Sequence, residues 1–312
     1  MKYAYVNMLY GDNLYFIGTL VFVISLLKTK PKYDVVLLHT PDVPKSKLEL
    51  LKQYYTKIIP IEYISLNKIK RKRFVDVYTK LQMFKLTEYD KILFMDNDMI
   101  VQQNIDHLFK YSTPAGMAVS ETLEYKDREK VLDRRVVFNA GLWLLNPSVE
   151  TFDKMIKGLD TFNTSYELEQ EYISYYYDGE WTNISYLYNF QFSLASIQQT
   201  PIRSNVYRKV KIKDVYVIHY SSPTKPWEFI NNINAHKYPR YAQYTNYYKK
   251  WLNLFTDIYM YYTRKGVYLI EKIKFVKIHR ELNREIKNIF NTSYNNFIVD
   301  DKNVFKLLPN VK

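Results

Sequence analysis

The chain has 312 residues, of which 47% are hydrophobic and 17% aromatic, so it can bury one large core or two modest ones. It contains no cysteine, which excludes disulfides, thiol nucleophiles and thiolate metal ligands. The net charge is +13, and residues 231–312 carry 15 Lys or Arg against six Asp or Glu. The basic character therefore belongs mainly to the C-terminal part of the chain.

Strand-like and helix-like segments alternate along the first hundred residues. Asn13 is a suitable N-cap for a helix that runs to about Lys28. This helix contains an uncharged stretch at 14–27, but a membrane span needs about 20 residues, so we expect a buried helix. Further helices are predicted at 45–55 and 79–86, and strands at 4–9, 34–39, 58–61 and 91–95.

The second part of the chain continues this alternation. Helices are predicted at 105–109, 150–159 and 167–177, and strands at 141–145 and 215–220. Ser148 is a suitable N-cap for the second of these helices. Because the strands are apolar runs separated by helices, we predict an α/β fold whose mostly parallel sheet lies between helices. Beyond Trp227 the pattern becomes aromatic and basic, with a helix predicted at 266–290, so we divide the chain into a domain at 1–230 and a basic helical extension at 231–312.

Two carboxylates, Asp96 and Asp98, follow the apolar strand at 91–95. A strand interior does not accept isolated charges, but the carboxyl end of a strand in an α/β sheet is where ligands bind. Two aspartates at that place can hold a hard divalent cation, and the cation can hold phosphates. For this motif alone, two solvated aspartates at a strand end remain the alternative.

Several short motifs, taken together, resemble those of the family 8 glycosyltransferases, the family of glycogenin. They occur in the order of that family and cover residues from about 3 to 227. The motifs are Tyr5-Val6-Asn7-Met8-Leu9-Tyr10-Gly11-Asp12 with Tyr15 and Gly18, Thr79-Lys80-Leu81, Phe94-Met95-Asp96-Asn97-Asp98, Asn104-Ile105-Asp106-His107-Leu108-Phe109, Phe138-Asn139-Ala140-Gly141, Asn146-Pro147-Ser148, Tyr188-Asn189, His219-Tyr220 and Lys225-Pro226-Trp227.

The resemblance implies a GT-A fold, which is Rossmann-like, and a retaining transfer of a hexose from a UDP-sugar. Glucose is the favoured hexose, and the acceptor is a hydroxyl on a glycan, protein or lipid. The resemblance also implies that Asp96, Asp98 and His219 hold Mn²⁺, with Mg²⁺ as a second choice. Two carboxylates and one imidazole suit such an ion. A hydrogen-bonded histidine at a strand end is the alternative for His219.

The resemblance assigns further roles to individual residues. Lys225 would contact the diphosphate and Lys80 would position the donor, with ordinary surface lysines as the alternative. Gln170 would support a cation-like transition state, and Glu169, where many relatives have Asp, would orient hydroxyls unless it only belongs to a charged helix face. The catalytic candidates are Gln170, Glu169 and Lys225. The candidates for donor contact are Asn7, Met8, Leu9, Tyr15, Arg71, Lys80, Asp96, Asn97, Asn139, Ala140, Gly141, Ser222 and Lys225.

The basic segment from residue 238 onward has three interpretations: a helical cap on the domain, a segment that binds anionic lipid surfaces, or a nucleic-acid-binding patch. For the whole chain, the alternatives to an enzyme are an inactive sugar-nucleotide-binding scaffold and, less favoured, a nucleic-acid-binding protein. An inactive relative is expected to lose an Asp or the His, and this chain keeps all three. We therefore expect a cytoplasmic enzyme without a nucleic-acid partner, and leave peripheral membrane contact and a homodimer open.

Overall fold

A computed structural model of the chain describes residues 1–11, 13–65, 76–119, 125–133, 136–159, 161–162, 169–191, 207, 209–222, 225–227 and 245–266. The strands are β1 (Tyr3–Leu9), β2 (Asp34–His39), β3 (Lys57–Pro60), β4 (Lys91–Met95), β5 (Met99–Val101), β6 (Ala115–Val119), β7 (Lys130–Leu132), β8 (Val137–Leu145), β9 (Glu180–Asn183) and β10 (Val217–His219). The α-helices are α1 (Tyr15–Lys28), α2 (Lys45–Leu51), α3 (Val149–Leu159), α4 (Glu169–Tyr176) and α8 (Thr245–Arg264), and the short 3₁₀ helices are η2 (Val77–Lys85), η3 (Asp106–Lys110), η4 (Tyr186–Tyr188) and η6 (Ile212–Asp214).

The predicted α/β fold is confirmed, and its central sheet is mixed. The strand order is β3-β2-β1-β4-β8-β6-β9-β7, in which β1, β2, β3 and β4 are parallel neighbours. β6 and β9 are also parallel, whereas β8 runs antiparallel to both β4 and β6. The strand predicted at 141–145 begins earlier, at Val137, because its antiparallel pairing with β6 extends to that residue.

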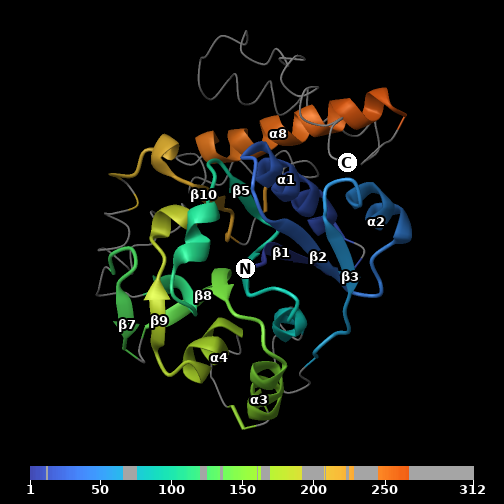
Figure 1. Cartoon of the computed structure of the whole chain (residues 1–312). Coiled ribbons are helices and arrows are strands. Elements are labelled where there is room, and N and C mark those ends of the chain that lie inside the picture. The colour runs from blue at the N-terminus through green and yellow to red at the C-terminus, as the bar shows by residue number, and fades with distance from the viewer. Residues whose placement is uncertain are drawn as a thin grey trace.

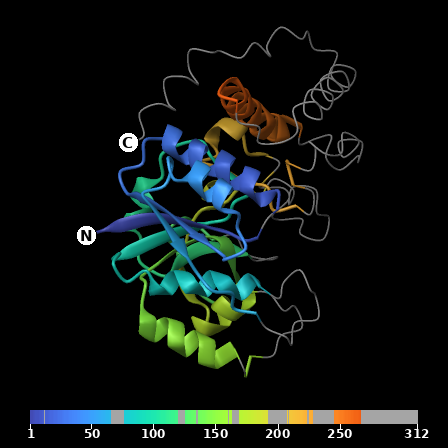
Figure 2. The same cartoon turned by 90° about the vertical axis from the view of Figure 1, so that its right-hand side faces the viewer.

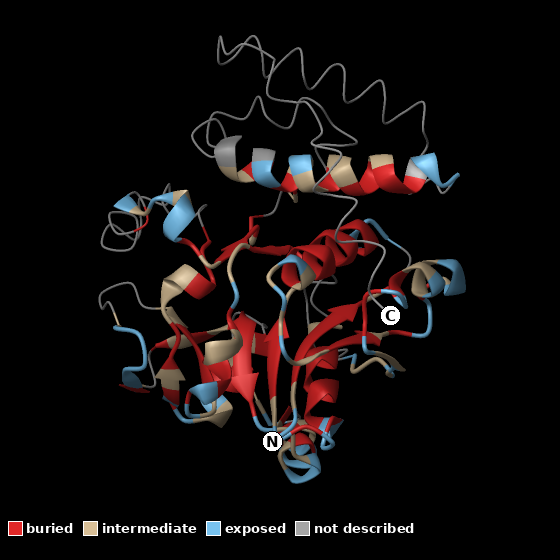
Figure 3. Ribbon diagram, turned by 45° about the horizontal axis from the view of Figure 1, so that its top comes forward, coloured by how far each residue is buried: buried red, intermediate tan, exposed pale blue. Residues whose placement is uncertain are grey.

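Helices cover both faces of the sheet (Figures 1 and 2). Side chains alternate along β1, so that Tyr5 and Leu9 join one hydrophobic cluster while Val6 and Met8 join another. The first cluster includes α1 and α8, and the second includes η2, α3 and α4. Figure 3 shows that the sheet and α1 form the buried centre of the molecule.

The apolar stretch at 14–27 lies largely in the buried helix α1, as predicted. Every residue of α1 from Phe16 to Leu26 is buried, which explains why it is uncharged. The helix begins at Tyr15, and Asn13 accepts a hydrogen bond from the backbone N–H of Tyr15 at 2.8 Å, although Leu14 occupies the N-cap position. No helix in the part of the chain that the structure describes is long and apolar enough to cross a membrane.

A separate two-stranded ribbon joins distant parts of the chain. β10 pairs antiparallel with β5, with His219 opposite Met99. The backbone N–H of Tyr220 donates to the carbonyl of Asp98 at 2.8 Å. The ribbon therefore brings His219 to the aspartate pair, from which it is separated by more than a hundred residues of sequence.

The described part of the C-terminal region is the helix α8, which lies over α1 in both views (Figures 1 and 2). Trp251, Phe255 and Ile258 are buried in the same cluster as α1. Their spacing places these apolar side chains along one face of α8. Of the helix predicted at 266–290, the structure describes only Gly266, and the division of the chain at residue 230 stays a prediction.

Candidate active site

The aspartate pair lies in the turn between β4 and β5, at the carboxyl end of β4. Asp96 follows the last residue of β4, and its backbone N–H donates to the carbonyl of Gly141 on β8 at 2.9 Å. Asn97 between the two aspartates is also fixed, because its amide donates to the carbonyl of Met8 and accepts from the amide of Asn7 at 2.6 Å. Two neighbouring strands thus hold the turn in place.

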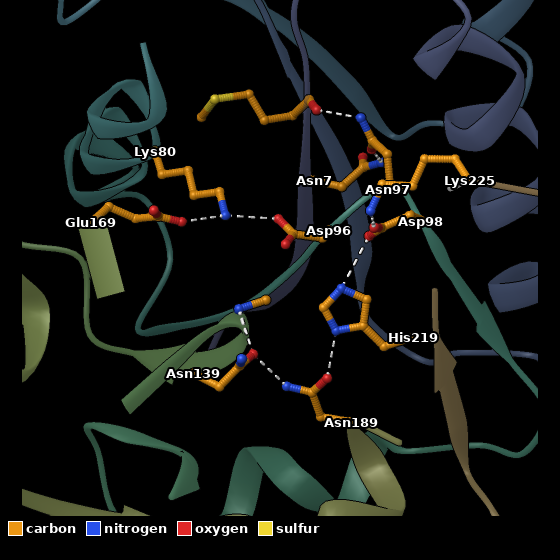
Figure 4. A network of polar contacts seen from close by, with 12 residues as sticks. Asn7, Lys80, Asp96, Asn97, Asp98, Asn139, Glu169, Asn189, His219 and Lys225 are labelled. Atoms are coloured by element: carbon orange, nitrogen blue, oxygen red, sulfur yellow. Dashed lines mark hydrogen bonds and ion pairs between the residues drawn. The ribbon is translucent and has the colours of Figure 1, made fainter. Parts of the chain in front are cut away.

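Asp96, Asp98 and His219 form a candidate site for a divalent cation. One ligand atom from each residue can be chosen so that all three lie within 4.8 Å of one another. The imidazole Nε2 of His219 lies 3.2 Å from Oδ1 of Asp98, and both residues are buried (Figure 4). Two carboxylate oxygens and one imidazole nitrogen are a donor set that divalent metal ions accept. The chemistry of the three residues therefore fits a metal ion.

The orientation of His219 is set by a chain of amide groups (Figure 4). Nδ1 of His219 lies 2.7 Å from Oδ1 of Asn189, and the Asn189 amide donates to Oδ1 of Asn139 at 2.8 Å. The same Asn139 oxygen accepts from the backbone N–H of Gly141 at 3.0 Å. Because the Asn189 oxygen can only accept, Nδ1 is the donor in this contact, and Nε2 is the nitrogen that points to Asp98.

Gly141 packs directly against this histidine. A Cβ at position 141 would lie 2.6 Å from Cε1 of His219 and 3.0 Å from the side-chain oxygen of Asn139. We expect Gly141→Ala to displace the imidazole and to weaken Mn²⁺ binding, measured by titration calorimetry, by about 10- to 100-fold. Gly158→Ala on α3 is the control, because its Cβ would crowd only Tyr172, and should leave Mn²⁺ affinity unchanged. Equal affinities in the Gly141→Ala and unmodified proteins would contradict the assignment of His219.

Two lysines bind the two aspartates separately. Lys225 Nζ lies 2.5 Å from Oδ2 of Asp98 and donates to the carbonyl of Tyr220 at 3.0 Å. Burial alone would raise the pKa of Asp98, but Lys225 and His219 hold it well below its usual range. The pKa of Lys225 is raised because the attraction of Asp98 outweighs its burial. Asp98 is therefore an ionised carboxylate with two basic partners.

The second lysine, Lys80, joins three elements of the fold. Its Nζ lies 2.9 Å from Oδ1 of Asp96 after β4 and 2.8 Å from Oε1 of Glu169 at the start of α4. Burial alone would lower the pKa of Lys80, but the two carboxylates raise it well above its usual value. Burial raises the pKa of Asp96, and Lys80 opposes that rise. Lys80 is thus a buried cation shared by two acids, rather than a solvated lysine on a helix face.

The other predicted residues lie around this centre. Asn7 is 1% exposed and is bonded to Asn97, so it supports the aspartate turn from within the core. Tyr15 packs edge-on against Trp227 at 4.8 Å between ring centroids, and Ser222 lies 3.1 Å from the hydroxyl of Tyr248. Of the remaining predicted residues, Met8 and Leu9 lie in the buried strand β1 and Ala140 lies in the buried strand β8. Gln170 is partly exposed on α4, and Arg71 lies outside the described residues.

Asn189 was missed as a functional residue by the analysis of the sequence. Its only signal is its place in the Tyr188-Asn189 motif, which indicated family membership but no role. The contact with His219 becomes visible only in three dimensions, because 30 residues separate the two along the chain.

Comparison with known proteins supplies a family for this geometry. Residues 7–231 match the sequence profile of glycosyl transferase family 8. An uncharacterized protein of Acanthamoeba polyphaga mimivirus is 38% identical over 278 residues, which cover 82% of this chain and 95% of that protein. Galactinol synthase 1 of Solanum lycopersicum is 27% identical over 280 residues, covering 84% of this chain and 85% of that one.

Solved structures support the fold. The glycosyltransferase GlyE of Streptococcus pneumoniae TIGR4 superimposes with a TM-score of 0.58 at 17% sequence identity, covering 93% of this chain. The chain spans 64% of the length of GlyE. The bifunctional glycosyltransferase WbbM gives a TM-score of 0.53 at 15% identity, covering 77% of this chain and 51% of that one. At these identities the likeness concerns the fold alone.

Proposed function

Because the chain belongs to glycosyl transferase family 8, we propose that it is a retaining, Mn²⁺-dependent enzyme that transfers a hexose from a UDP-sugar to a hydroxyl of a glycan, protein or lipid. The observation that carries this proposal is the convergence of Asp96, Asp98 and His219 at the carboxyl end of β4. These three residues would hold the ion, which when bound would offset negative charge on the diphosphate. A nucleotide sugar carries both a diphosphate, which such an ion would bind, and a sugar, which would contact the surface beside the ion.

Lys225 is the residue that we assign to the leaving group. Its ammonium already lies 2.5 Å from Asp98, so it is at the site where the diphosphate of the donor would bind. When the bond between the hexose and the diphosphate breaks, negative charge grows on the phosphate oxygens. A buried ammonium that donates a hydrogen bond there stabilises this charge more in the transition state than in the bound donor.

The sugar side of the site is assigned to α4 and to the start of β8. Lys80 bonds to Glu169 at the beginning of α4, and Gln170 is the next residue of that helix. In a retaining reaction without a protein nucleophile, the acceptor hydroxyl attacks from the face that the diphosphate leaves. The new bond from the acceptor oxygen to the sugar forms as the bond to the diphosphate breaks, and the hydroxyl proton passes to the departing phosphate oxygen. We assign the amide oxygen of Gln170 to stabilising the positive charge on the sugar, and Asn139 with Gly141 to a backbone surface against which the sugar packs.

The direct test is UDP release in the presence of Mn²⁺ across a panel of UDP-sugars, each with and without a chelator. UDP-glucose is the donor expected from the sequence, and UDP-galactose belongs in the panel because the relatives include galactinol synthases. Release from one donor that stops when the chelator is added supports the proposal. If no UDP-sugar is bound or cleaved, with or without added sugar acceptors, the inactive scaffold becomes the better explanation.

Gln170→Ala tests the assignment on the sugar side. We expect kcat to fall by about 100-fold, whereas the affinity for the donor changes little, because the interaction forms mainly in the transition state. Steady-state kinetics gives kcat, and calorimetry with UDP gives the affinity. Gln103→Ala is the control, since Gln103 bonds to the carbonyl of Lys213 on the ribbon side and should keep full turnover. An unchanged kcat in Gln170→Ala would remove this role.

A further inference from the structure

Lys225 lies on a short segment of chain that follows the ribbon. The segment begins after His219, the last residue of β10, and ends at Trp227. At its beginning, the N–H of Tyr220 donates to the carbonyl of Asp98 at 2.8 Å, and the Tyr220 carbonyl accepts from the ammonium of Lys225 at 3.0 Å. The position of Lys225 therefore also depends on what holds the other end of the segment, at Trp227.

The indole ring of Trp227 packs directly on α1. Trp227 is 2% exposed, and a Cβ at Gly18 would lie only 2.5 Å from Cζ3 of the ring, so the ring rests on the backbone of the helix. The ring of Tyr15 packs against it edge-on, at 4.8 Å between centroids. Trp227 follows Lys225 by two residues, so an enclosed ring at 227 restricts where the backbone of Lys225 can lie.

The helix α8 contacts the same segment at both ends. The ring of Trp251, which is fully buried, lies 6.0 Å from the ring of Trp227 between centroids. Nearer the ribbon, the hydroxyl of Tyr220 donates to a backbone carbonyl of α8 at 2.7 Å, and Oγ of Ser222 lies 3.1 Å from the hydroxyl of Tyr248. The segment is therefore enclosed between α1 and α8, the two helices that lie together in Figures 1 and 2.

The metal-binding histidine is held by other elements. β10 pairs with β5, and the backbone N–H of His219 donates to the carbonyl of Phe190 at 3.0 Å. The imidazole is oriented by Asn189. Loosening the packing at Trp227 should therefore move Lys225 and leave His219 in place.

From these contacts we propose that Trp227 is a positioning residue, and that α8 acts through Trp251 to hold it on α1 so that the ammonium of Lys225 stays at Asp98. The family profile ends at residue 231, so α8 contributes to the site from outside the matched part of the chain. The inference rests on the proposed function where it concerns UDP. A diphosphate that meets an ammonium already in position binds more tightly than one that must order it.

The first experiment measures how accessible the amine of Lys225 is in the full-length protein without ligand. Acetic anhydride labels lysine amines, and peptide mass spectrometry gives the rate for each lysine. The side chains of Lys225 and Lys80 are 13% and 11% exposed, so both should react slowly. Trp227→Leu and Trp251→Leu should each raise the rate at Lys225 by about 3- to 10-fold. The rate at Lys80 should stay the same, which separates local release from general loosening.

The second experiment measures binding by calorimetry. In Trp227→Leu, the affinity for UDP with Mn²⁺ should fall by about 3- to 10-fold, whereas the affinity for Mn²⁺ alone should not fall. Lys225→Met should lose at least as much affinity for UDP. Adding Trp227→Leu to Lys225→Met should cause no further loss, because Trp227 acts through Lys225. A substitution that only damaged the core would weaken UDP binding equally with and without the lysine.

Two further variants keep the test decisive. Phe109→Leu is the control, because Phe109 is 1% exposed in the same hydrophobic cluster but packs on Tyr3, at the opposite edge of the sheet. It should change neither the labelling of Lys225 nor the affinity for UDP. If Trp227→Leu does not fold, Trp227→Phe keeps a smaller ring and should still raise the labelling of Lys225 by about 2-fold or more.

The inference is overturned if Lys225 is labelled at the normal rate in the folded tryptophan variants, or if Lys80 reacts faster to the same extent. It is equally overturned if Phe109→Leu shows the same change, or if the losses from Trp227→Leu and Lys225→Met add. Should the labelling change as expected while the unmodified protein binds no UDP, the proposed function fails and the positioning of Lys225 by Trp227 stands.

Discussion

Asp98→Asn is expected to abolish measurable Mn²⁺ binding and to reduce UDP release by about 100- to 1,000-fold. The carboxylate contacts the imidazole of His219 at 3.2 Å and the ammonium of Lys225 at 2.5 Å. An amide keeps the shape of the side chain but carries no charge to attract the ion. Electron paramagnetic resonance of free Mn²⁺ measures binding without any need for turnover.

The same substitution has a second effect, which has to be separated from the first. Loss of the Asp98 charge leaves the largely enclosed ammonium of Lys225, whose side chain is 13% exposed, without its counter-ion, which costs about 3 kcal/mol of unfolding free energy. The double variant Asp98→Asn with Lys225→Met removes the stranded charge, and should recover stability in urea denaturation without recovering Mn²⁺ binding. Asp153→Asn, at an exposed position on α3, controls for removal of one carboxylate. Normal Mn²⁺ affinity in a folded Asp98→Asn protein would refute the metal assignment.

Patterns along the chain predicted the parallel half of the sheet more accurately than the mixed half. The strands β2 and β4 begin and end where their apolar runs do, because both are interior strands of the sheet and are buried on both faces. β7 is a three-residue strand with one buried residue between exposed ones, and β9 is a four-residue strand in which buried residues alternate with more exposed ones; both patterns are too brief to predict a strand. The direction of β8 is set by which strands it pairs with, and periodicity carries no such information.

The residues of the site divide in the same way, into those that the local sequence predicts and those whose contacts depend on distant parts of the chain. Asp96 and Asp98 could be predicted because two charges beside an apolar strand are informative by themselves. His219 required the ordered motifs of a family. The bond between Lys80 and Glu169 joins residues 89 positions apart, so neither segment by itself predicts the bond. Sequence predicted both residues as separate participants, and only the fold shows that they share one buried charge network.

Lys80→Met is expected to destabilise the protein more than removal of any surface lysine. Its ammonium lies between the carboxylates of Asp96 and Glu169, and its loss leaves the buried Glu169 and the partly buried Asp96 without a counter-ion, at a cost of about 3–5 kcal/mol of unfolding free energy. Urea denaturation at neutral pH measures this cost. Lys154→Met is the control, because Lys154 pairs with Glu150 on the exposed face of α3 and should change stability very little.

The dependence on pH distinguishes stranded charges from lost packing. Without Lys80, burial raises the pKa of Asp96 in the folded state above the unfolded value, so the folded variant binds a proton more tightly. Its stability relative to the unmodified protein should therefore recover as the pH falls toward about 4 to 5, and worsen as the pH rises. Lys80→Met with Glu169→Gln removes one of the two stranded charges and should regain part of the stability at neutral pH. A deficit that is the same at every pH, and that the second substitution does not reduce, would mean that Lys80 acts through the packing of its aliphatic stem rather than through its charge.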